Sequence, residues 1–245
     1  MIKYNYFSIL LNDEKFNQPD LFHSNMKKVI IFGTGGFAQI IYQYLKKDPK
    51  FNIVAFTANE YAIREKTIYD LPIVPFETIE QTYPPESFQM FIALGYTDMN
   101  RKRAKFFKES KDKGYSLISY VHPSNIINDE FQMGENCFIF ENNVIQPFVK
   151  LEDNVIIWTG NVISHHTTIR SHCFIVSHVA IAGNTIIDTH CFIGINATIR
   201  NSVRIARECV IGAGAIILEN TQEKGVYASR STEKLDIPSN MLKNL

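Results

Sequence analysis

The chain has 245 residues, 45% of them hydrophobic, and its 25 basic residues balance 25 acidic ones to a formal net charge of zero at pH 7. This length can bury a sizeable core and leaves room for two domains. The balanced charge gives no reason to expect attraction to nucleic acid or to a membrane surface. No apolar run approaches the roughly 18 to 20 residues of a membrane-spanning helix, and residues 1–25 lack the features of a secretory signal. We therefore expect a cytoplasmic protein with no membrane insertion and no nucleic-acid partner.

The first half of the chain alternates apolar runs with helical stretches. Residues 1–25 stand outside this pattern and are expected to be an N-terminal extension. The strands predicted over residues 26–122 are 28–32, 51–57, 90–94 and 116–121, and the helices are 36–47 and about 100–113. Strands that alternate with helices predict a small Rossmann-like βαβ domain with a parallel sheet.

The turn after the first predicted strand reads Gly33-Thr34-Gly35-Gly36-Phe37-Ala38, a G-x-G-x-x-A pattern between a strand and a helix. Glycines let the backbone approach a ligand closely, and a helix N-terminus presents free amides to phosphate. A dinucleotide site would also require an acidic residue at the end of the second strand, where this chain has Thr57-Ala58-Asn59. Because the domain is also short, binding of a nucleotide or nucleotide sugar is favoured over binding of NAD.

A six-residue repeat dominates the second half of the chain. Every sixth residue from Ile127 to Ile217 is a large aliphatic one, sixteen times without a gap. The residues two positions earlier are mostly small, and in an extended segment positions i and i+2 share a face. Each hexad is therefore predicted to be one short strand with two inward side chains and a polar turn. Three such strands make an 18-residue triangular coil, so the repeat predicts a parallel β-helix over residues 123–221, followed by a C-terminal tail, 222–245.

All four cysteines, Cys137, Cys173, Cys191 and Cys209, occupy the small inward position of the repeat. Their spacings of 36, 18 and 18 residues are multiples of the coil length, which permits a stacked column. We expect buried structural thiols. No CxxC pair suggests zinc, and no metal is expected.

A glycine-turn βαβ domain followed directly by a hexapeptide prism resembles the bacterial sugar acyltransferases. These comprise the PglD-like N-acetyltransferases of nucleotide-linked amino sugars and the sialic acid O-acetyltransferases. The segments that carry the resemblance are 30–36 (IIFGTGG), 92–95 (IALG), 159–169 (TGNVISHHTTI) and 212–215 (GAGA). The resemblance implies a left-handed β-helix, a homotrimer with active sites between subunits, and acetyl-CoA as co-substrate.

The resemblance also implies that the N-terminal domain holds the nucleotide sugar and that the prism holds acetyl-CoA. The substrate-binding residues implied are Gly33, Thr34, Gly35, Gly36, Thr57, Asn59, Gly95 and Tyr96. The residues implied for the cofactor are Phe174, Gly183, Ile195 and Ala213.

The catalytic histidine of the family falls on His165. An amine that attacks a thioester must lose a proton, and imidazole, with an ordinary pKa of about 6.5, suits a general base at neutral pH. Relatives often have an acidic residue directly after this histidine, whereas this chain has His166. The sequence therefore offers His165 and His166 as catalytic candidates and leaves open what orients His165.

The remaining histidines of the repeat, His172, His178 and His190, are expected at the surface or at the trimer interface, with the first and last stacked on one face because they are 18 residues apart. Trp158 is expected to be a packing residue. The arginines Arg200, Arg204 and Arg207 are expected on a solvated face rather than on CoA phosphates.

The function expected from the resemblance is acetyl-CoA-dependent N-acetylation of a nucleotide-linked 4-amino-4,6-dideoxy sugar for surface glycan biosynthesis, by direct attack with a histidine base. The nearest alternative is a sugar O-acetyltransferase of the sialic acid type. A γ-carbonic-anhydrase-like metalloenzyme on the same prism is a different class, but it requires a histidine pair five residues apart, which this chain lacks. A β-helix scaffold without catalysis is the structural alternative.

Overall fold

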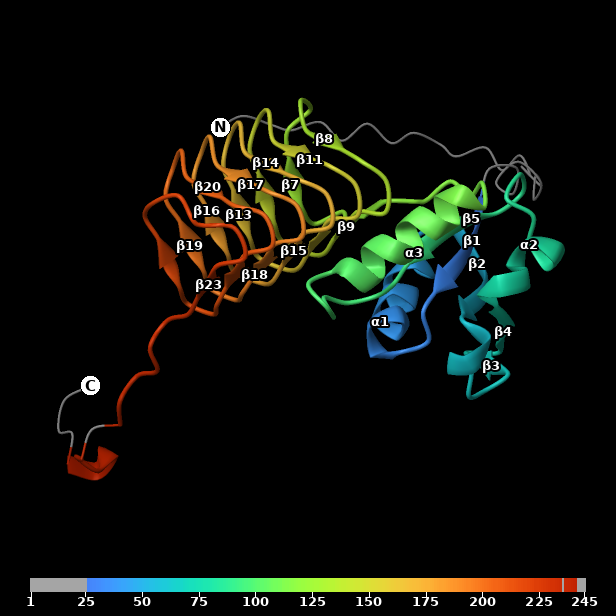
Figure 1. Cartoon of the computed structure of the whole chain (residues 1–245), viewed down its shortest axis with the longest axis horizontal. Helices are drawn as coiled ribbons and strands as arrows, with labels where there is room; N and C mark the ends of the chain where they lie inside the picture. The colour runs from blue at the N-terminus through green and yellow to red at the C-terminus, as the bar shows by residue number, and fades with distance from the viewer. Residues whose placement is uncertain (1–25, 235, 242–245) are drawn as a thin grey trace, which may run out of the picture.

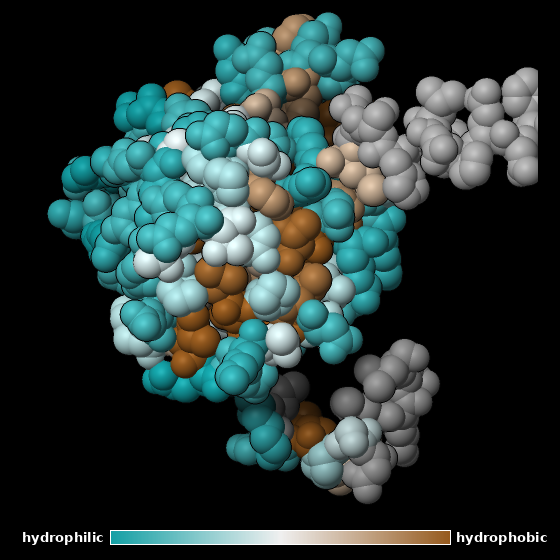
Figure 2. Space-filling model, turned by 90° about the vertical axis from the view of Figure 1, so that its right-hand side faces the viewer, coloured by the Kyte–Doolittle hydropathy of each residue, from teal (hydrophilic) through white to brown (hydrophobic). Residues whose placement is uncertain are grey.

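The computed structural model describes residues 26–234 and 236–241, so the N-terminal extension 1–25 lies outside the described residues. Two parts lie side by side, an N-terminal α/β domain and a prism of stacked short strands, with α3 on the side of the domain that faces the prism (Figure 1). The end of the molecule formed by the N-terminal domain is mostly hydrophilic around a hydrophobic band (Figure 2). Within the described ranges, no helix has the length and hydropathy needed to cross a membrane.

The N-terminal domain is built on a five-stranded sheet of order β3-β4-β2-β1-β5, in which only β3 is antiparallel to its neighbour. Its strands are β1 (Lys27–Phe32), β2 (Phe51–Ala58), β3 (Thr67–Ile68), β4 (Leu71–Pro75) and β5 (Gln89–Ile92). Its helices are α1 (Gly36–Leu45), α2 (Ile79–Thr82) and α3 (Arg101–Asp112), with 3-10 turns at Glu60–Ala62 and Phe76–Thr78. Ile41 of α1 packs in the core on one face of the sheet and Phe106 of α3 in the core on the other. The parallel βαβ domain predicted from the sequence is thus confirmed.

Two parts of the sequence prediction for this domain need correction. The predicted strand 116–121 is not a strand of the first sheet: Leu117 makes only an isolated bridge to Met90, and the chain then enters the prism. Tyr120 donates its backbone N–H to Cys137 O at 2.9 Å, so that β6 (Tyr120–Val121) is already a strand of the first coil. The sequence prediction also missed β3 and β4, because prolines at 72 and 75 hide the strand pattern.

The prism consists of three parallel sheets made of two-residue strands. The β6 sheet contains β6, β9 (Phe138–Ile139), β12 (Ile156–Ile157), β15 (Phe174–Ile175), β18 (Phe192–Ile193), β21 (Val210–Ile211) and β23 (Val226–Tyr227). The β7 sheet contains β7 (Ile126–Ile127), β10 (Val144–Ile145), β13 (Val162–Ile163), β16 (Ala180–Ile181), β19 (Thr198–Ile199) and β22 (Ile216–Ile217). The β8 sheet contains β8 (Gln132–Met133), β11 (Lys150–Leu151), β14 (Thr168–Ile169), β17 (Ile186–Ile187) and β20 (Arg204–Ile205).

The register of these sheets confirms the 18-residue coil. Ile145 pairs with Ile163, which pairs with Ile181, and the same step recurs in the other two sheets. The repeated aliphatic residues fill the interior of the prism. The strands β6 and β23 extend the prism beyond the range 123–221 expected from the repeat, because Tyr227 pairs with Ile211 after an irregular loop.

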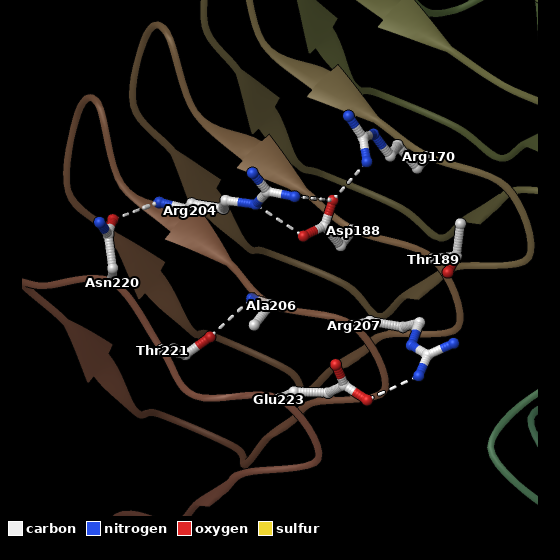
Figure 3. Close-up of a pocket in the computed structure, with 9 residues that line it drawn as sticks. All are labelled: Arg170, Asp188, Thr189, Arg204, Ala206, Arg207, Asn220, Thr221 and Glu223. Carbon is white, nitrogen blue, oxygen red and sulfur yellow. Dashed lines mark hydrogen bonds and ion pairs between the residues drawn. The ribbon is translucent and has the colours of Figure 1, made fainter.

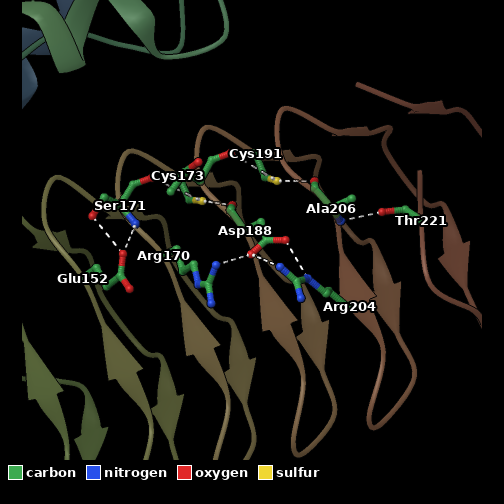
Figure 4. Close-up of polar contacts among 10 residues, drawn as sticks. Glu152, Arg170, Ser171, Cys173, Asp188, Cys191, Arg204, Ala206 and Thr221 are labelled. Carbon is green, nitrogen blue, oxygen red and sulfur yellow. Dashed lines mark hydrogen bonds and ion pairs between the residues drawn. The ribbon is translucent and has the colours of Figure 1, made fainter. Parts of the chain in front are cut away.

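The four cysteines are buried free thiols at equivalent positions of their coils. Cys173 Sγ lies 3.0 Å from Asp188 O and Cys191 Sγ 3.1 Å from Ala206 O (Figure 4). Burial raises the pKa of Cys137 to about 12. The column of structural thiols is therefore confirmed, with Val155 taking the coil between Cys137 and Cys173.

One turn position in each hexad has a left-handed backbone conformation. From residue 136 to residue 214 this position recurs every six residues with φ between 52° and 72°. Its occupants are Asn136, Asn142, Phe148, Asn154, Gly160, His166, His172, His178, Asn184, His190, Asn196, Ser202, Glu208 and Gly214. Asparagine, histidine and glycine tolerate positive φ better than most residues. Four of the five histidines of the repeat, His166, His172, His178 and His190, therefore occupy a position whose backbone conformation suits them.

The loop after β22 closes the top of the β8 sheet with side chains. Asn220 Oδ1 accepts the N–H of Arg204 at 2.8 Å, and Thr221 Oγ1 accepts that of Ala206 at 2.7 Å (Figure 3). One coil below, the N–H of Asp188 instead donates to a backbone carbonyl, that of Ile205, at 2.9 Å. The two side chains therefore accept hydrogen bonds from backbone N–H groups that would otherwise have no partner, because the β8 sheet has no further strand beyond β20.

The outer surface of the β8 sheet carries an ion-pair ladder. The nearly buried carboxylate of Asp188 pairs with Arg170 Nη1 at 2.9 Å and with Arg204 Nε at 2.7 Å (Figure 3 and Figure 4). Arg207 pairs with Glu223 (Figure 3). Arg204 and Arg207 lie on an exposed face, as expected, and their charges are matched by these carboxylates.

Candidate active site

The glycine turn lies where the carboxyl ends of β1, β2 and β5 meet. Gly33 has a φ of 121°, and a Cβ placed on it would lie 2.8 Å from Ala93 O, so only glycine fits. The N–H of Gly33 donates to Thr57 O and that of Ala93 to Phe32 O, both at 2.8 Å. The structure therefore brings the 33–36 turn and the loop after β5 together at one edge of the sheet, the place where open α/β sheets bind ligands.

The other glycines of these loops leave open space. A Cβ placed on Gly35, Gly36 or Gly95 would meet no atom within 4 Å. Gly35 caps α1 without any side-chain hydrogen bond to its amides. Within the described residues, no side chain caps the first amides of α1, which follow Thr34 and Gly35.

Two of the predicted substrate residues have their polar groups engaged within the protein. Thr57 is buried and its Oγ1 donates to Val74 O at 2.7 Å. Asn59 Nδ2 donates to Glu77 Oε1 at 2.9 Å, and Glu77 Oε2 accepts the N–H of Glu60. Glu77, which the sequence analysis did not single out, is thus the acidic residue at the end of β2 and β4.

A pocket of about 420 Å³ joins the two domains at the corner between the β6 and β7 sheets. The ring of Tyr96, from the loop after β5, lies against Phe174 and Phe192 with centroid distances of 5.1 and 4.8 Å. The lining residues are Tyr96, Trp158, Phe174, Val176, Ser177, Phe192, Gly194, Ile195 and Ala213. The structure therefore brings Tyr96 of the expected substrate set together with three members of the expected cofactor set. Trp158 is stacked on Phe140 at a centroid distance of 4.5 Å, in agreement with the expected packing role, and it also lines the pocket.

His165 lies exposed at a different corner, in the turn between β13 and β14. Its N–H donates to Gln146 Oε1 at 3.0 Å, and its Nδ1 lies 3.2 Å from Nδ1 of His166. A Cβ on Gly183 would lie 2.6 Å from Cε1 and 2.8 Å from Nε2 of His165. Gly183 therefore lies directly over the His165 ring, one coil above as expected, and makes room for it.

The two candidate regions do not meet within one chain. The pocket belongs to the corner between the β6 and β7 sheets, whereas His165 belongs to the corner between the β7 and β8 sheets.

His172 and His190 stack at a centroid distance of 4.8 Å, as expected from their spacing. Their predicted position at the surface or trimer interface is wrong for His172, whose ring packs against Phe107 of α3 at 5.7 Å. Burial lowers the pKa of His172 to about 4. His178 is exposed, with its ring against Gly160. Among the residues that the structure describes, no group of three or more potential metal ligands is found.

The sequence analysis missed Arg103, which is fully buried in the seam between α3 and the prism. Its Nη1 donates to Gly95 O at 3.1 Å and its Nη2 to Cys173 O at 3.0 Å, so one side chain ties the Tyr96 loop to the coil that carries Phe174. The signal available in the sequence was the row of bulky residues outside the β6 sheet, Phe138, Ile156, Phe174 and Phe192, which a docked domain has to cover.

Comparison with known proteins gives two matches to family models. Residues 28–110 match the PglD N-terminal domain, and residues 184–219 match the hexapeptide repeat of succinyl-transferase. The comparison with curated proteins finds no match.

Several solved structures share the fold over most of the chain. The acetyltransferase domain of PglB from Neisseria gonorrhoeae is 21% identical with a TM-score of 0.74, covering 85% of this chain and 100% of its own. PerB from Caulobacter crescentus, in complex with CoA and GDP-perosamine, is 23% identical with a TM-score of 0.74, covering 82% of this chain and 94% of its own. WeeI from Acinetobacter baumannii is 16% identical with a TM-score of 0.71, and the match covers 82% of this chain and 96% of the WeeI chain. These likenesses confirm a Rossmann-like domain followed by a left-handed parallel β-helix. With the two family matches they also confirm the resemblance, seen in the sequence, to hexapeptide-repeat proteins that carry a PglD-type N-terminal domain.

Proposed function

We propose that this protein is an acetyl-CoA-dependent N-acetyltransferase of a nucleotide-linked 4-amino-4,6-dideoxy sugar, acting in surface glycan biosynthesis. The observation that carries the proposal is the 420 Å³ pocket in which Tyr96 of the nucleotide-sugar domain meets Phe174, Ile195 and Ala213 of the prism. Further support comes from neighbours of the same fold, PglB in complex with acetyl coenzyme A and PerB in complex with CoA and GDP-perosamine.

The two halves of the pocket suit the two substrates. The open turn at Gly35 and Gly36, with the free amides of α1, receives the phosphates of the sugar nucleotide. Gly95 and Tyr96 place the sugar next to the prism, and the apolar wall of Ile195 and Ala213 binds the acyl end of acetyl-CoA. Thr57 and Asn59 contribute by holding the ends of β2 and β4 that form the rim.

His165 is the proposed general base, because its ring is exposed and carries no ion pair within the described residues. Acetyl-CoA, when bound, supplies the acetyl group as a thioester. The sugar amine forms a bond to the carbonyl carbon, the carbon–sulfur bond breaks, and the amine proton passes to His165 Nε2 and then to the leaving thiolate. No covalent intermediate with the protein is needed.

A homotrimer would complete this site. The outward residues of the β7 sheet are largely apolar, and Ile126, Val162 and Ile216 are 68%, 42% and 68% exposed. The β7 sheet lies between the pocket corner and the His165 corner. If three chains pack with their β7 sheets around a common axis, each pocket corner faces the His165 corner of the next chain, in agreement with the separation seen within one chain.

The proposal is tested by incubating the purified protein with acetyl-CoA and UDP-, dTDP- or GDP-linked 4-amino-4,6-dideoxy sugars and measuring acetylated product by mass spectrometry. We expect one of these sugar nucleotides to be N-acetylated, and light scattering to give the mass of three chains. Failure of every amino sugar, with transfer to a hydroxyl of a sialic-acid-type sugar instead, would favour an O-acetyltransferase. Absence of acetyl-CoA binding would favour a scaffold.

A further inference from the structure

The two neighbouring histidines at the catalytic turn face each other through the same ring atom. Nδ1 of His165 lies 3.2 Å from Nδ1 of His166, and the two rings stand at 84° to each other. Within the described residues, neither ring makes another hydrogen bond or an ion pair through its nitrogens. Each of the two Nδ1 atoms therefore has the other as its partner.

Two facing Nδ1 atoms can form a hydrogen bond only if one carries a proton and the other a lone pair. When His165 is the donor, its Nε2 holds the lone pair and is free to accept a proton from substrate. When His166 is the donor, Nε2 of His165 carries the proton and the base is blocked. The catalytic competence of His165 therefore depends on which of these two tautomers is present.

We infer that His166 is a positioning residue: it accepts a hydrogen bond from Nδ1–H of His165 and thereby keeps Nε2 of His165 unprotonated. This rests on the proposed function, in which His165 is the base.

The fold holds both rings in place for this contact. His166 has the left-handed φ of 58° shared by the turn positions, its N–H donates to Pro147 O at 3.2 Å, and its ring lies 4.7 Å from that of Phe148. The His165 ring lies beneath Gly183, where any Cβ would contact it. The coil that carries the two histidines and the coils on either side of it therefore hold the two Nδ1 atoms close together.

The test compares two substitutions of His166 that differ in the ability to accept a hydrogen bond. His166→Asn tolerates the left-handed backbone and offers an amide oxygen, whereas His166→Phe retains a ring against Phe148 but offers no acceptor. His178→Phe, at the same backbone conformation with φ of 58°, is the matched control. We expect His166→Phe to lower kcat about 10- to 100-fold, the usual range for loss of a residue that orients another. The acetyl-CoA KM and thermal midpoint should stay unchanged, and His166→Asn should retain most activity.

A spectroscopic readout separates positioning from a merely structural role. Imidazole ¹⁵N chemical shifts should show His165 protonated at Nδ1 in the wild type and in a mixture of tautomers in His166→Phe.

Equal kcat values for His166→Asn and His166→Phe, or a His165 protonated at Nε2, would overturn the inference. These results are distinguishable from failure of the proposed function. If His165→Ala abolishes turnover while all His166 variants remain active, only the inference fails. If His165→Ala is fully active, the proposed base is wrong.

Discussion

Arg103 and Asn154 join the two domains directly, because Nε of the arginine donates to Oδ1 of the asparagine at 3.0 Å. Asn154 belongs to a column of left-handed turn residues, and its Oδ1 also accepts from Asn136 Nδ2 at 2.8 Å. Asn136 in turn accepts the N–H of Ile92, at the end of β5, at 2.7 Å. The same turn geometry that closes each coil therefore supplies the polar groups that dock the N-terminal domain.

Arg103→Met should destabilise the protein and loosen the Tyr96 loop. Burial lowers the pKa of Arg103 to about 10, so the side chain remains charged at neutral pH and its donors serve acceptors on both domains. Losing these donors strands several buried acceptors, each at a cost of about 1 to 3 kcal/mol. We expect a thermal midpoint lower by on the order of 10 °C and faster amide exchange in residues 93–100. Arg101→Met, which removes exposed ion pairs with Asp98 and Glu208, is the control. Equal midpoints for the two variants would contradict this role.

His172 should make the fold sensitive to mild acid. Its pKa is lowered to about 4 in the folded protein, mainly by burial and further by His190 and Arg103, from an ordinary value of 6.5. The unfolded chain therefore takes up this proton first, so the stability contribution is complete above about pH 6.5 and is lost progressively as the pH falls toward 4. The full pKa shift corresponds to a change of roughly 3 kcal/mol in the free energy of unfolding.

His172→Asn removes this titration and keeps a residue suited to the left-handed turn, as Asn154 does one coil below. Urea unfolding at pH 7, 6, 5 and 4 should show a weaker loss of stability for the variant than for the wild type. His178→Asn, at an exposed turn, is the control and should follow the wild type. Parallel curves for all three proteins would show that His172 does not carry this acid sensitivity.

Gly35→Val and Gly33→Val should have opposite consequences. At Gly35 a Cβ meets no atom within 4 Å, so the protein should fold normally while the branched side chain obstructs the phosphate-binding turn. We expect a raised KM for the sugar nucleotide and near-normal acetyl-CoA binding. At Gly33 the φ of 121° and the contact with Ala93 O should destabilise the domain instead. If Gly35→Val weakens only acetyl-CoA binding, the roles of the two domains are reversed.

The sequence predicts the position of a residue when local spacing decides it, and fails when contact with a distant segment decides it. Ile145 and Ile163 face inward because of their own spacing, so the coil, its length and the thiol column were predictable. The environments of Arg103 and His172 are created by docking of α3, which depends on packing between segments about 50 to 70 residues apart. Sequence periodicity therefore placed His172 on the outside of a coil but did not show that a second domain covers it.

The role of His165 can be tested by removing its ring and, separately, by crowding the ring from the neighbouring coil. His165→Ala should lower kcat about a hundredfold to ten-thousandfold, as expected for loss of a general base, with trimer formation and acetyl-CoA affinity retained.

Gly183→Ala should act on the same ring from above, because the new Cβ would lie within 2.6 to 2.8 Å of Cε1 and Nε2. The histidine is exposed and can rotate away, so we expect little change in thermal midpoint but a clear fall in kcat. In the double variant, Gly183→Ala should add almost nothing to His165→Ala, since the ring through which it acts is gone. Additive losses in log kcat would mean that Gly183 acts elsewhere, for example on acetyl-CoA itself. A wild-type kcat in His165→Ala would instead remove this histidine from the mechanism.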